Sequence, residues 1–299
     1  MYKLKGSIVA LVTPMEFDGS IAWQSLFDLI DWHIESGTKG IVFVGTTGES
    51  ATIDVAEHVQ IIEQSSEHVK GRIPVIAGTG ANSTKEAIYL TSAAKKAGAD
   101  AVLLVTPYYN KPTQKGLVAH YSEIANQVDI PQILYNVPAR TGCDLLPKTV
   151  LKLSKLKNIV GLKDATGDLA RLEELKEVLA NQIINESFLL YSGDDPTSAQ
   201  FVLNGGSGTV SVTANVVPSE IAKICDFALK GSSREAIALN AKLDELNKCL
   251  FIESNPIPVK WILNRLGRIP PGLRLPLTAL DSKYHHKMEL LLQEISLLK

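Results

Sequence analysis

Eight short apolar runs, rich in β-branched residues, recur along the chain, and amphipathic segments separate them. Successive runs start roughly 20–35 residues apart, which is the spacing of one strand–helix unit. The intervening segments, such as SLFDLIDWHIESG and KEAIYLTSAAKKAG, show helical periodicity. Because the runs are apolar throughout instead of alternating with polar residues, the pattern predicts a closed parallel (β/α)8 barrel, the TIM barrel. The runs begin at Ser7, Gly40, Pro74, Ala101, Pro131, Ile159, Phe188 and Thr209.

An open, doubly wound α/β sheet is the alternative fold. Such a sheet usually carries a glycine-rich turn after its first strand, and here that turn reads TPMEFDGS, without the G-x-G-x-x-G pattern. The nearest approximation, GTG at Gly78–Gly80, is too short to indicate a nucleotide site. The barrel is therefore the better prediction.

The pattern changes after Asn215, where only helical periodicity continues. It is interrupted at NPIP (Asn255–Pro258) and at IPPG (Ile269–Gly272). A barrel needs one more helix at this point, so most of the tail is surplus. We therefore expect a catalytic barrel over residues 1–225 and a C-terminal helical appendage over residues 226–299. We expect the last helix to pack inward through Leu290, Leu291, Leu292, Ile295 and Leu298.

Composition excludes several classes of function. Hydrophobic residues make up 45% of the 299 residues and the net charge is -2, which is typical of a globular protein and not of a nucleic-acid or anionic-membrane binder. The apolar run at the start, in MYKLKGSIVALVTP, is expected to be too short for a signal peptide or a membrane span. The three cysteines are widely spaced, which favours a reducing cytoplasm. None of the six histidines falls at the end of a predicted strand, so we expect no metal site.

The sixth run, IVGLKDA, carries a lysine in its middle. Strand alternation predicts that Lys163 shares a face with the small residues Gly161 and Ala165, and that the other face carries Val160, Leu162 and Asp164. Burial in apolar surroundings lowers the pKa of a lysine, and the neutral amine can form a Schiff base. Alternatively, a carboxylate neutralises the lysine, although Asp164 lies on the wrong face. The strand alone leaves both readings open.

Polar residues follow several of the predicted strands, where active sites of these barrels lie. GTTGES (Gly45–Ser50) would bind a small carboxylate or only cap the next helix. Tyr135 is a buried tyrosine that needs a hydrogen-bond partner, such as Lys163 or a threonine. From the pattern alone, Tyr109 could be an aromatic lid without a chemical role. Arg140, which follows a proline turn, could be a solvated surface residue. Asp194 and Asp195 are expected to cap the following helix.

Three motifs in this order, namely GTTGES, YNVPxR and the lysine of the sixth strand, resemble the dihydrodipicolinate synthase family of pyruvate-dependent class I aldolases. The likeness extends over the whole chain, from GSIVALVTP at Gly6 through VTPYYN at Val105 and TANV at Thr213 to NPIPVK at Asn255. GTTGES alone would indicate only the wider superfamily.

The resemblance implies catalytic roles for four residues. Lys163 would form a Schiff base with pyruvate, and Tyr135 would relay protons to and from it. Thr46 would connect Tyr135 to Tyr109, which would reach in from a neighbouring subunit. The amides near Thr46 and Thr47 would bind the carboxylate of pyruvate. A sensor or scaffold that has lost catalysis is the contrasting hypothesis, but it should lack one of the four catalytic residues.

The resemblance also implies the second substrate and the absence of a cofactor. Arg140 would bind the carboxylate of L-aspartate 4-semialdehyde, whereas similar sialic-acid lyases lack an arginine at this place. Gly193 and Val210 match positions whose backbone lines the pocket. No metal or organic cofactor would be needed, since the amine itself acts as electron sink. The reaction would belong to lysine and diaminopimelate biosynthesis.

Finally, the resemblance implies regulation and assembly. Lysine, the end product, would bind as an effector in a cleft at a dimer interface, and the protein would be a homotetramer built as a dimer of dimers. Val55 stands where lysine-sensitive members often carry histidine, which predicts weaker binding of the effector. The matching effector positions are Ser50, Ala51, His58, Asn82, Glu86 and Tyr108.

Overall fold

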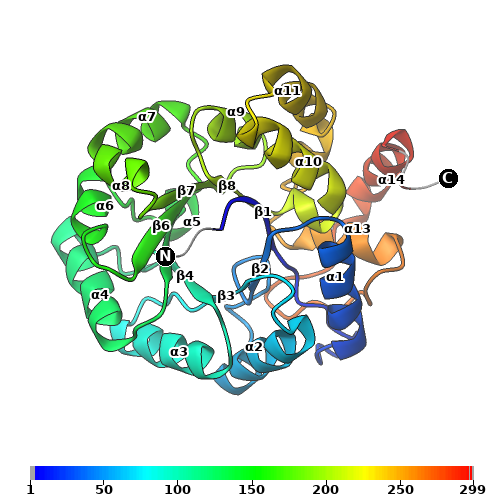
Figure 1. The fold of residues 1–299 in the computed structure, drawn as a ribbon. Coiled ribbons are helices and arrows are strands. Elements are labelled where there is room, and N and C mark those ends of the chain that lie inside the picture. Colours follow the sequence, from blue (N-terminus) through cyan, green and yellow to red (C-terminus); the bar gives the residue numbers. More distant parts are fainter. Residues whose placement is uncertain (1–3, 296, 298–299) are drawn as a thin grey trace.

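The fold is a closed barrel of eight parallel strands in sequence order, as the hydrophobic pattern predicted. The computed structural model describes residues 4–295 and 297. Strand β1 pairs with both β2 and β8, which closes the ring (Figure 1). All eight apolar runs form strands: β1 Gly6–Ala10, β2 Gly40–Phe43, β3 Val75–Gly78, β4 Ala101–Val105, β5 Gln132–Asn136, β6 Ile159–Asp164, β7 Leu189–Ser192 and β8 Gly208–Ser211.

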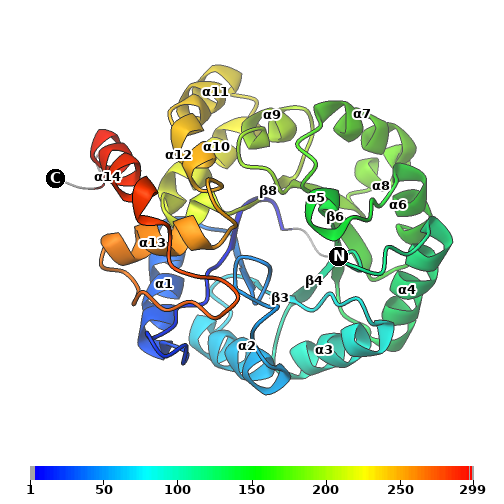
Figure 2. The same cartoon turned by 180° about the vertical axis from the view of Figure 1, so that it is seen from behind.

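Helices surround the barrel and cover the outer face of its strands (Figure 1). Four of them begin at a capping side chain: Asp54 precedes α2, Ser83 precedes α3, Thr113 precedes α4 and Asp168 precedes α7. These local signals start each helix shortly after the preceding strand. The helices of this ring are α1 Trp23–Glu35, α2 Val55–Val69, α3 Thr84–Lys96, α4 Gln114–Gln127, α6 Pro147–Leu153, α7 Leu169–Val178, α8 Ala180–Ile184, α9 Ser198–Leu203 and α10 Pro218–Leu229. The short α5 Pro138–Thr141 lies inside the ring, at the carboxyl end of β5 (Figure 2).

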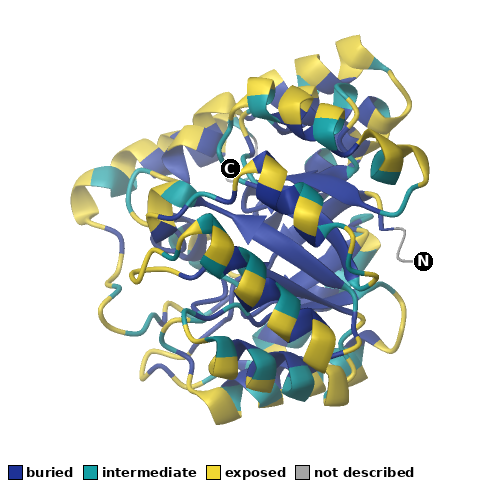
Figure 3. Ribbon diagram, turned by 90° about the vertical axis from the view of Figure 1, so that its left-hand side faces the viewer, coloured by how far each residue is buried: buried dark blue, intermediate teal, exposed yellow. Residues whose placement is uncertain are grey.

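The apolar core has two layers because the strands are buried on both faces (Figure 3). Residues that point inward, such as Ile8, Val42 and Ile76, fill the barrel. Residues that point outward, such as Val9, Ile41 and Leu104, pack against the helices. At the amino-terminal end, Tyr191 in β7 donates a hydrogen bond to the carbonyl oxygen of Leu4 at 2.7 Å. The interior of the barrel is thus a filled core, and a cavity opens towards the carboxyl ends of the strands.

Strand β6 departs from the regular alternation that the sequence predicted. The register between β5 and β6 shifts at Gln132/Ile133, so that β6 has one extra residue there. As a result Val160 packs inside the barrel, whereas Leu162 packs outside it. The prediction that Val160 and Leu162 share a face was therefore wrong, because a bulge changes the phase of a strand. Beyond the bulge Lys163 and Asp164 still point to opposite faces.

The C-terminal extension lies beside α1 and α10, at one side of the barrel (Figure 2). The predicted boundary at residue 225 falls inside α10, an unbroken helix that contacts β1 and β8, and the division into barrel and appendage stays a prediction. In the final helix Leu291 and Leu292 are buried but Leu290 is half exposed, and Leu298 lies outside the described residues. The extension comprises α11 Ser233–Ala241, α12 Asp244–Cys249, α13 Ile257–Arg265, η2 Ser282–Tyr284 and α14 His285–Glu294; the short η1 Thr213–Asn215 directly follows β8.

Candidate active site

A cavity of about 210 Å³ opens at the carboxyl ends of the strands. Residues from strand ends and loops all around the barrel meet there, although they are far apart in the sequence. The lining residues are Ala10, Val42, Gly45, Thr46, Thr47, Leu103, Tyr135, Val137, Ala139, Arg140, Lys163, Ala165, Gly193, Asp194, Val212, Phe251 and Asn255. The predicted residues Lys163, Tyr135, Thr46, Thr47, Arg140 and Gly193 therefore line one cavity.

Lys163 lies inside this cavity and is only 5% exposed. Its ammonium nitrogen lies 4.2 Å from the centroid of the Tyr135 ring, since β5 and β6 pair in a register that places the two residues side by side. Burial lowers the pKa of Lys163 to about 8; the negative charge of Asp195 raises it, and the positive charge of Arg140 lowers it further. A substantial fraction of the amine is therefore neutral near pH 8, as a Schiff-base nucleophile requires.

Asp164 does not neutralise Lys163, because it points to the outer face of β6. Its carboxylate accepts hydrogen bonds from the guanidinium of Arg171 at 3.1 Å and from the amide of Asn136 at 3.1 Å. Arg171 also binds Asp144, which follows the loop that carries Arg140. Among the residues that the structure describes, Lys163 forms no ion pair. The reading in which a carboxylate of a neighbouring strand pairs with this lysine is thus not what the structure contains.

Gly193, at the end of β7, leaves the space that the side chain of Lys163 occupies. A Cβ atom at this position would lie 2.7 Å from Cε of Lys163 and 2.8 Å from Cβ of Ala165. Such distances are far below normal van der Waals contact, so a side chain here would push the lysine out of place. Glycine at this position is therefore required by the packing around the amine.

Tyr135 is placed to donate or accept a proton beside Lys163. Burial raises the pKa of its phenol, while the positive charge of Arg140 and a hydrogen bond with Thr46 lower it. Since burial is the largest of these effects, Tyr135 is a protonated phenol at neutral pH. It therefore has the hydrogen-bond partner that a buried tyrosine needs, and this partner is Thr46.

The segment Gly45–Ser50 forms a tight turn at the cavity. The amide of Glu49 donates to the carbonyl oxygen of Thr46 at 3.1 Å, and the amide of Ser50 donates to that of Gly45 at 3.2 Å. Helix α2 has its own cap, Asp54, so the turn does not serve as a helix cap. Polar groups of the turn are thus available to a ligand at the cavity wall.

Of the two acidic residues after β7, Asp195 does not cap α9, whereas the carboxylate of Asp194 accepts a hydrogen bond from the amide of Thr197 at 3.2 Å, directly before that helix. One oxygen of Asp195 accepts hydrogen bonds from the amides of Val212 at 2.9 Å and Thr213 at 3.0 Å. Asp194 accepts from the hydroxyl of Thr197 at 2.7 Å. Asp195 therefore ties the end of β7 to the loop that follows β8, and Asp194 fixes the turn before α9.

Two predicted residues do not line the cavity of the single chain. Val210 lies one layer deeper, in the barrel interior, and the lining position on the same strand path is Val212. Tyr109 is 90% exposed and has a positive φ of 73°, a region that non-glycine residues rarely adopt. Its predicted contact with a neighbouring subunit stays a prediction.

A second hollow of about 270 Å³ shares Thr46, Val137 and Arg140 with the first. Burial lowers the pKa of His58 to about 4, and burial together with the charge of Glu86 raises that of Tyr108. Val55 is not among the lining residues; it is 41% exposed at the start of α2. Of the predicted effector residues, those in the lining are Ser50, Ala51, His58, Glu86 and Tyr108, while the backbone of Asn82 accepts a hydrogen bond from Asn110.

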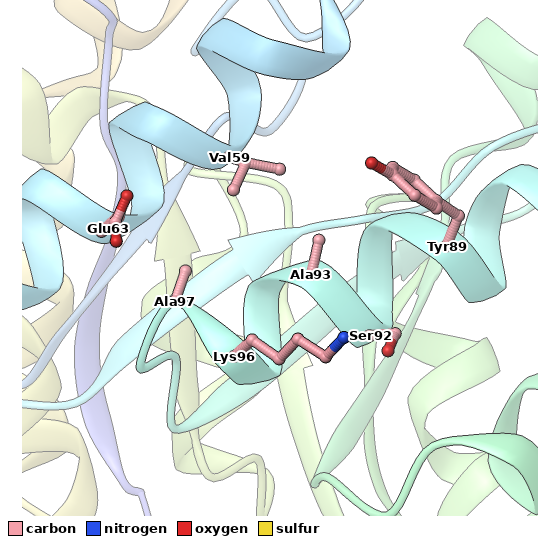
Figure 4. A pocket seen from close by; sticks show the side chains of 7 residues that line it. All are labelled: Val59, Glu63, Tyr89, Ser92, Ala93, Lys96 and Ala97. Atoms are coloured by element: carbon pink, nitrogen blue, oxygen red, sulfur yellow. The ribbon is translucent and has the colours of Figure 1, made fainter.

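A further groove, of about 290 Å³, lies outside the barrel between α2 and α3 (Figure 4). Val59 and Glu63 line it from α2, and Tyr89 and Lys96 line it from α3. Lys96 is exposed, so it lacks the burial that distinguishes Lys163. This groove shares no residue with the barrel cavity.

The cavity residues that sequence reasoning missed include Val212, Phe251 and Asn255. Asn255 could have been found from the sequence, because the NPIPVK motif begins with it.

Over the described part of the chain, no three histidine, cysteine, aspartate or glutamate residues come together in a way that could hold a metal ion. None of the helices described is both long and apolar enough to cross a bilayer.

The model of the dihydrodipicolinate synthetase family matches residues 3–295. A protein of Saccharophagus degradans named 4-hydroxy-tetrahydrodipicolinate synthase is 56% identical over 295 residues, which are 99% of this chain and 100% of that protein.

Two solved structures cover the same span. The first is a chloride-inhibited dihydrodipicolinate synthase from Acinetobacter baumannii in complex with pyruvate, with 51% identity, a TM-score of 0.95 and coverage of 99% of this chain and 100% of that one. The second is the enzyme from Cyanidioschyzon merolae with lysine bound, with 36% identity, a TM-score of 0.94 and coverage of 100% of both chains.

Proposed function

This chain belongs to the dihydrodipicolinate synthetase family, and on that premise we propose that its barrel cavity condenses pyruvate with L-aspartate 4-semialdehyde. The chain is an enzyme with 4-hydroxy-tetrahydrodipicolinate synthase activity, a lyase of lysine and diaminopimelate biosynthesis. The observation that carries the residue assignment is Lys163: a buried amine, its pKa lowered to about 8, at the wall of a cavity large enough for a small oxo acid.

The first step joins Lys163 to pyruvate. The neutral amine attacks the ketone carbon, a carbinolamine forms, and loss of water gives an iminium ion. Loss of a proton from the methyl carbon then gives an enamine, whose methyl-derived carbon is the nucleophile. Tyr135 relays these protons, which fits its position beside the amine and its hydrogen bond with Thr46. The iminium withdraws the electrons, so this chemistry requires no metal or organic cofactor.

Thr46 and Thr47 hold the carboxylate of pyruvate. The amides and hydroxyls of the turn are the donors at the cavity wall, and a carboxylate bound there would leave the ketone within reach of Lys163. The Acinetobacter baumannii structure, 51% identical in sequence, contains pyruvate. This supports pyruvate as the first substrate here.

Arg140 binds the carboxylate of the semialdehyde. It lies on α5, which begins two residues after β5, and it lines the cavity at its mouth. The enamine adds to the aldehyde carbon, and the amine of the semialdehyde then displaces Lys163 by transimination. Ring closure releases the cyclic product and regenerates the free lysine.

Regulation and assembly complete the proposal. Lysine binds as an effector in the second hollow, where Glu86 would pair with its ammonium group; the lysine-bound structure of a relative supports this. Tyr109 completes the proton relay from a neighbouring subunit of a homotetramer built as a dimer of dimers. Its exposure and strained backbone in the single chain fit a contact outside that chain. We place the enzyme in the cytoplasm.

Borohydride reduction in the presence of pyruvate tests the proposal. We expect a stable adduct on the peptide that contains Lys163, and no adduct in Lys163→Met. The trapping rate should rise about tenfold per pH unit below 8 and level off above it, because only the neutral amine reacts. An adduct on another lysine, or none in the unaltered protein, would overturn the assignment.

A further inference from the structure

Two motifs far apart in the sequence meet beside the cavity in a buried ion pair that the reaction itself does not use. Glu49 belongs to GTTGES, and Lys260 belongs to NPIPVK of the C-terminal extension. The ammonium of Lys260 binds one oxygen of the Glu49 carboxylate. The Lys260 side chain is 3% exposed and that of Glu49 is fully buried. This ion pair therefore lies entirely inside the protein.

The charged groups of Lys260 and Glu49 bind segments that contact the turn Thr46–Gly48. Lys260 also donates to the carbonyl oxygen of Thr13 at 3.0 Å, and the hydroxyl of Thr13 donates to the carbonyl oxygen of Gly48 at 2.7 Å. The second oxygen of Glu49 accepts a hydrogen bond from the amide of Arg274 at 3.3 Å. Both carboxylate oxygens are thus held by residues of the extension.

The backbone of the turn depends on where the side chain of Glu49 goes. Glu49 has a positive φ of 60°, which L-residues adopt only when their surroundings hold them there. Its amide closes the turn onto Thr46, whose neighbour Thr47 accepts a hydrogen bond from the amide of Asn255 at 3.0 Å. Asn255 and Lys260 lie in the same motif, so the extension contacts the turn at two points.

Stability alone does not account for a buried pair of this kind. Removing two charges from water is costly, and a well-packed apolar pair of similar volume is often as stable or more so. What an ion pair adds is that it fixes the orientation of its two side chains relative to each other. Here that orientation fixes the turn, whose residues Thr46 and Thr47 line the cavity.

We propose that Glu49 and Lys260 are positioning residues through which the C-terminal extension holds the turn Thr46–Gly48 in the shape that binds the carboxylate of the oxo-acid substrate. The inference rests on the proposed role of Thr46 and Thr47 as the carboxylate site. Neither Glu49 nor Lys260 touches the substrate. Their loss therefore weakens binding of pyruvate and leaves the chemistry on Lys163 largely intact.

The test is the double variant Glu49→Gln/Lys260→Met, which removes both charges and leaves none unpaired. Borohydride trapping is measured against pyruvate concentration, together with the kinetic constants for both substrates. We expect half-saturating pyruvate to rise about tenfold or more, the loss expected when one charge-assisted hydrogen bond weakens. The trapping rate at saturating pyruvate and the KM for the semialdehyde should change little.

Arg265→Met is the matched control. Arg265 lies in the same helix, α13, and pairs with Glu289 at 2.8 Å, but this pair is exposed and distant from the turn. It should leave half-saturating pyruvate unchanged. Glu49→Asp keeps both charges but shortens the side chain by one methylene group, so it should raise half-saturating pyruvate by a smaller factor.

The outcomes separate this inference from the proposed function. If the unaltered protein forms no adduct with pyruvate, the proposed function fails. If the unaltered protein does form the adduct, the variants decide. When the double variant or Glu49→Asp melts cooperatively and saturates at the same pyruvate concentration as the unaltered protein, the pair has only a structural role. An equal rise in the KM of both substrates would likewise overturn the positioning role.

Discussion

Replacing the proposed nucleophile should make the protein more stable. Lys163 is buried without an ion pair among the described residues, and its pKa falls from the usual 10.5 to about 8. Below pH 8 the amine of Lys163 is protonated in the folded protein although it is buried. In the unfolded chain the same ammonium group is solvated by water, so its charge destabilises the folded state relative to the unfolded one. With each pKa unit worth about 1.4 kcal/mol, the penalty at pH 7 is about 3 kcal/mol, and Lys163→Met removes it.

The sign of the pH dependence follows from the direction of the shift. Between pH 8 and 10.5 the unfolded chain binds a proton that the folded protein has released, so stability rises with pH over this window. The advantage of Lys163→Met is therefore complete below pH 8 and vanishes as the pH approaches 10.5. For a chain of this length, 3 kcal/mol corresponds to a rise in Tm of about 5 °C at pH 7.

The assay is thermal unfolding without pyruvate at pH 7 and at pH 10, with Lys260→Met as the control. Both lysines are buried, but Lys260 is paired, so its removal leaves Glu49 as an unpaired buried charge. That change should cost about 3–5 kcal/mol. The same substitution at two buried lysines thus has opposite effects. A Tm of Lys163→Met at or below that of the unaltered protein at pH 7, or a gain that persists at pH 10, would refute the reasoning.

Three further predictions concern activity and regulation. Arg140→Ala should raise the KM for the semialdehyde about tenfold to a hundredfold and that for pyruvate far less, as steady-state kinetics would measure; equal effects would contradict an acceptor-carboxylate role. Gly193→Ala should slow borohydride trapping about tenfold or more, because its Cβ would displace Lys163, while Gly116→Ala in α4 should trap normally. Lysine should bind in calorimetry at millimolar concentration, and Val55→His should bind it up to about tenfold more tightly; the absence of any heat in both proteins would exclude the effector site.

The barrel could be predicted because its evidence is local. Each strand is a short apolar run, and the direction of Lys163 follows from alternation over the last few residues of β6. The bulge at Val160 could not be read from the sequence, because it depends on how β5 and β6 pair. The same holds for Asp195, which resembles a helix cap in sequence but binds the amides after β8.

The contribution of the C-terminal extension to the cavity also depends on tertiary packing. More than two hundred residues separate Thr47 from Asn255, and no periodicity connects them. The sequence shows two motifs, but only the folded chain shows that one supports the other. The direction of Lys163 could thus be read from its own strand, whereas the contact between Asn255 and Thr47 could not, because it requires two distant segments to be juxtaposed.

The bulge in β6 has a consequence for how this strand tolerates change. It divides the strand into a lower part, which ends at Val160, and an upper part, which carries the lysine. A regular strand would place residues three apart on opposite faces. With the bulge, Val160 and Lys163 both face the interior, so removal of the extra residue at Val160 would restore the alternation without turning the lysine to the outer face.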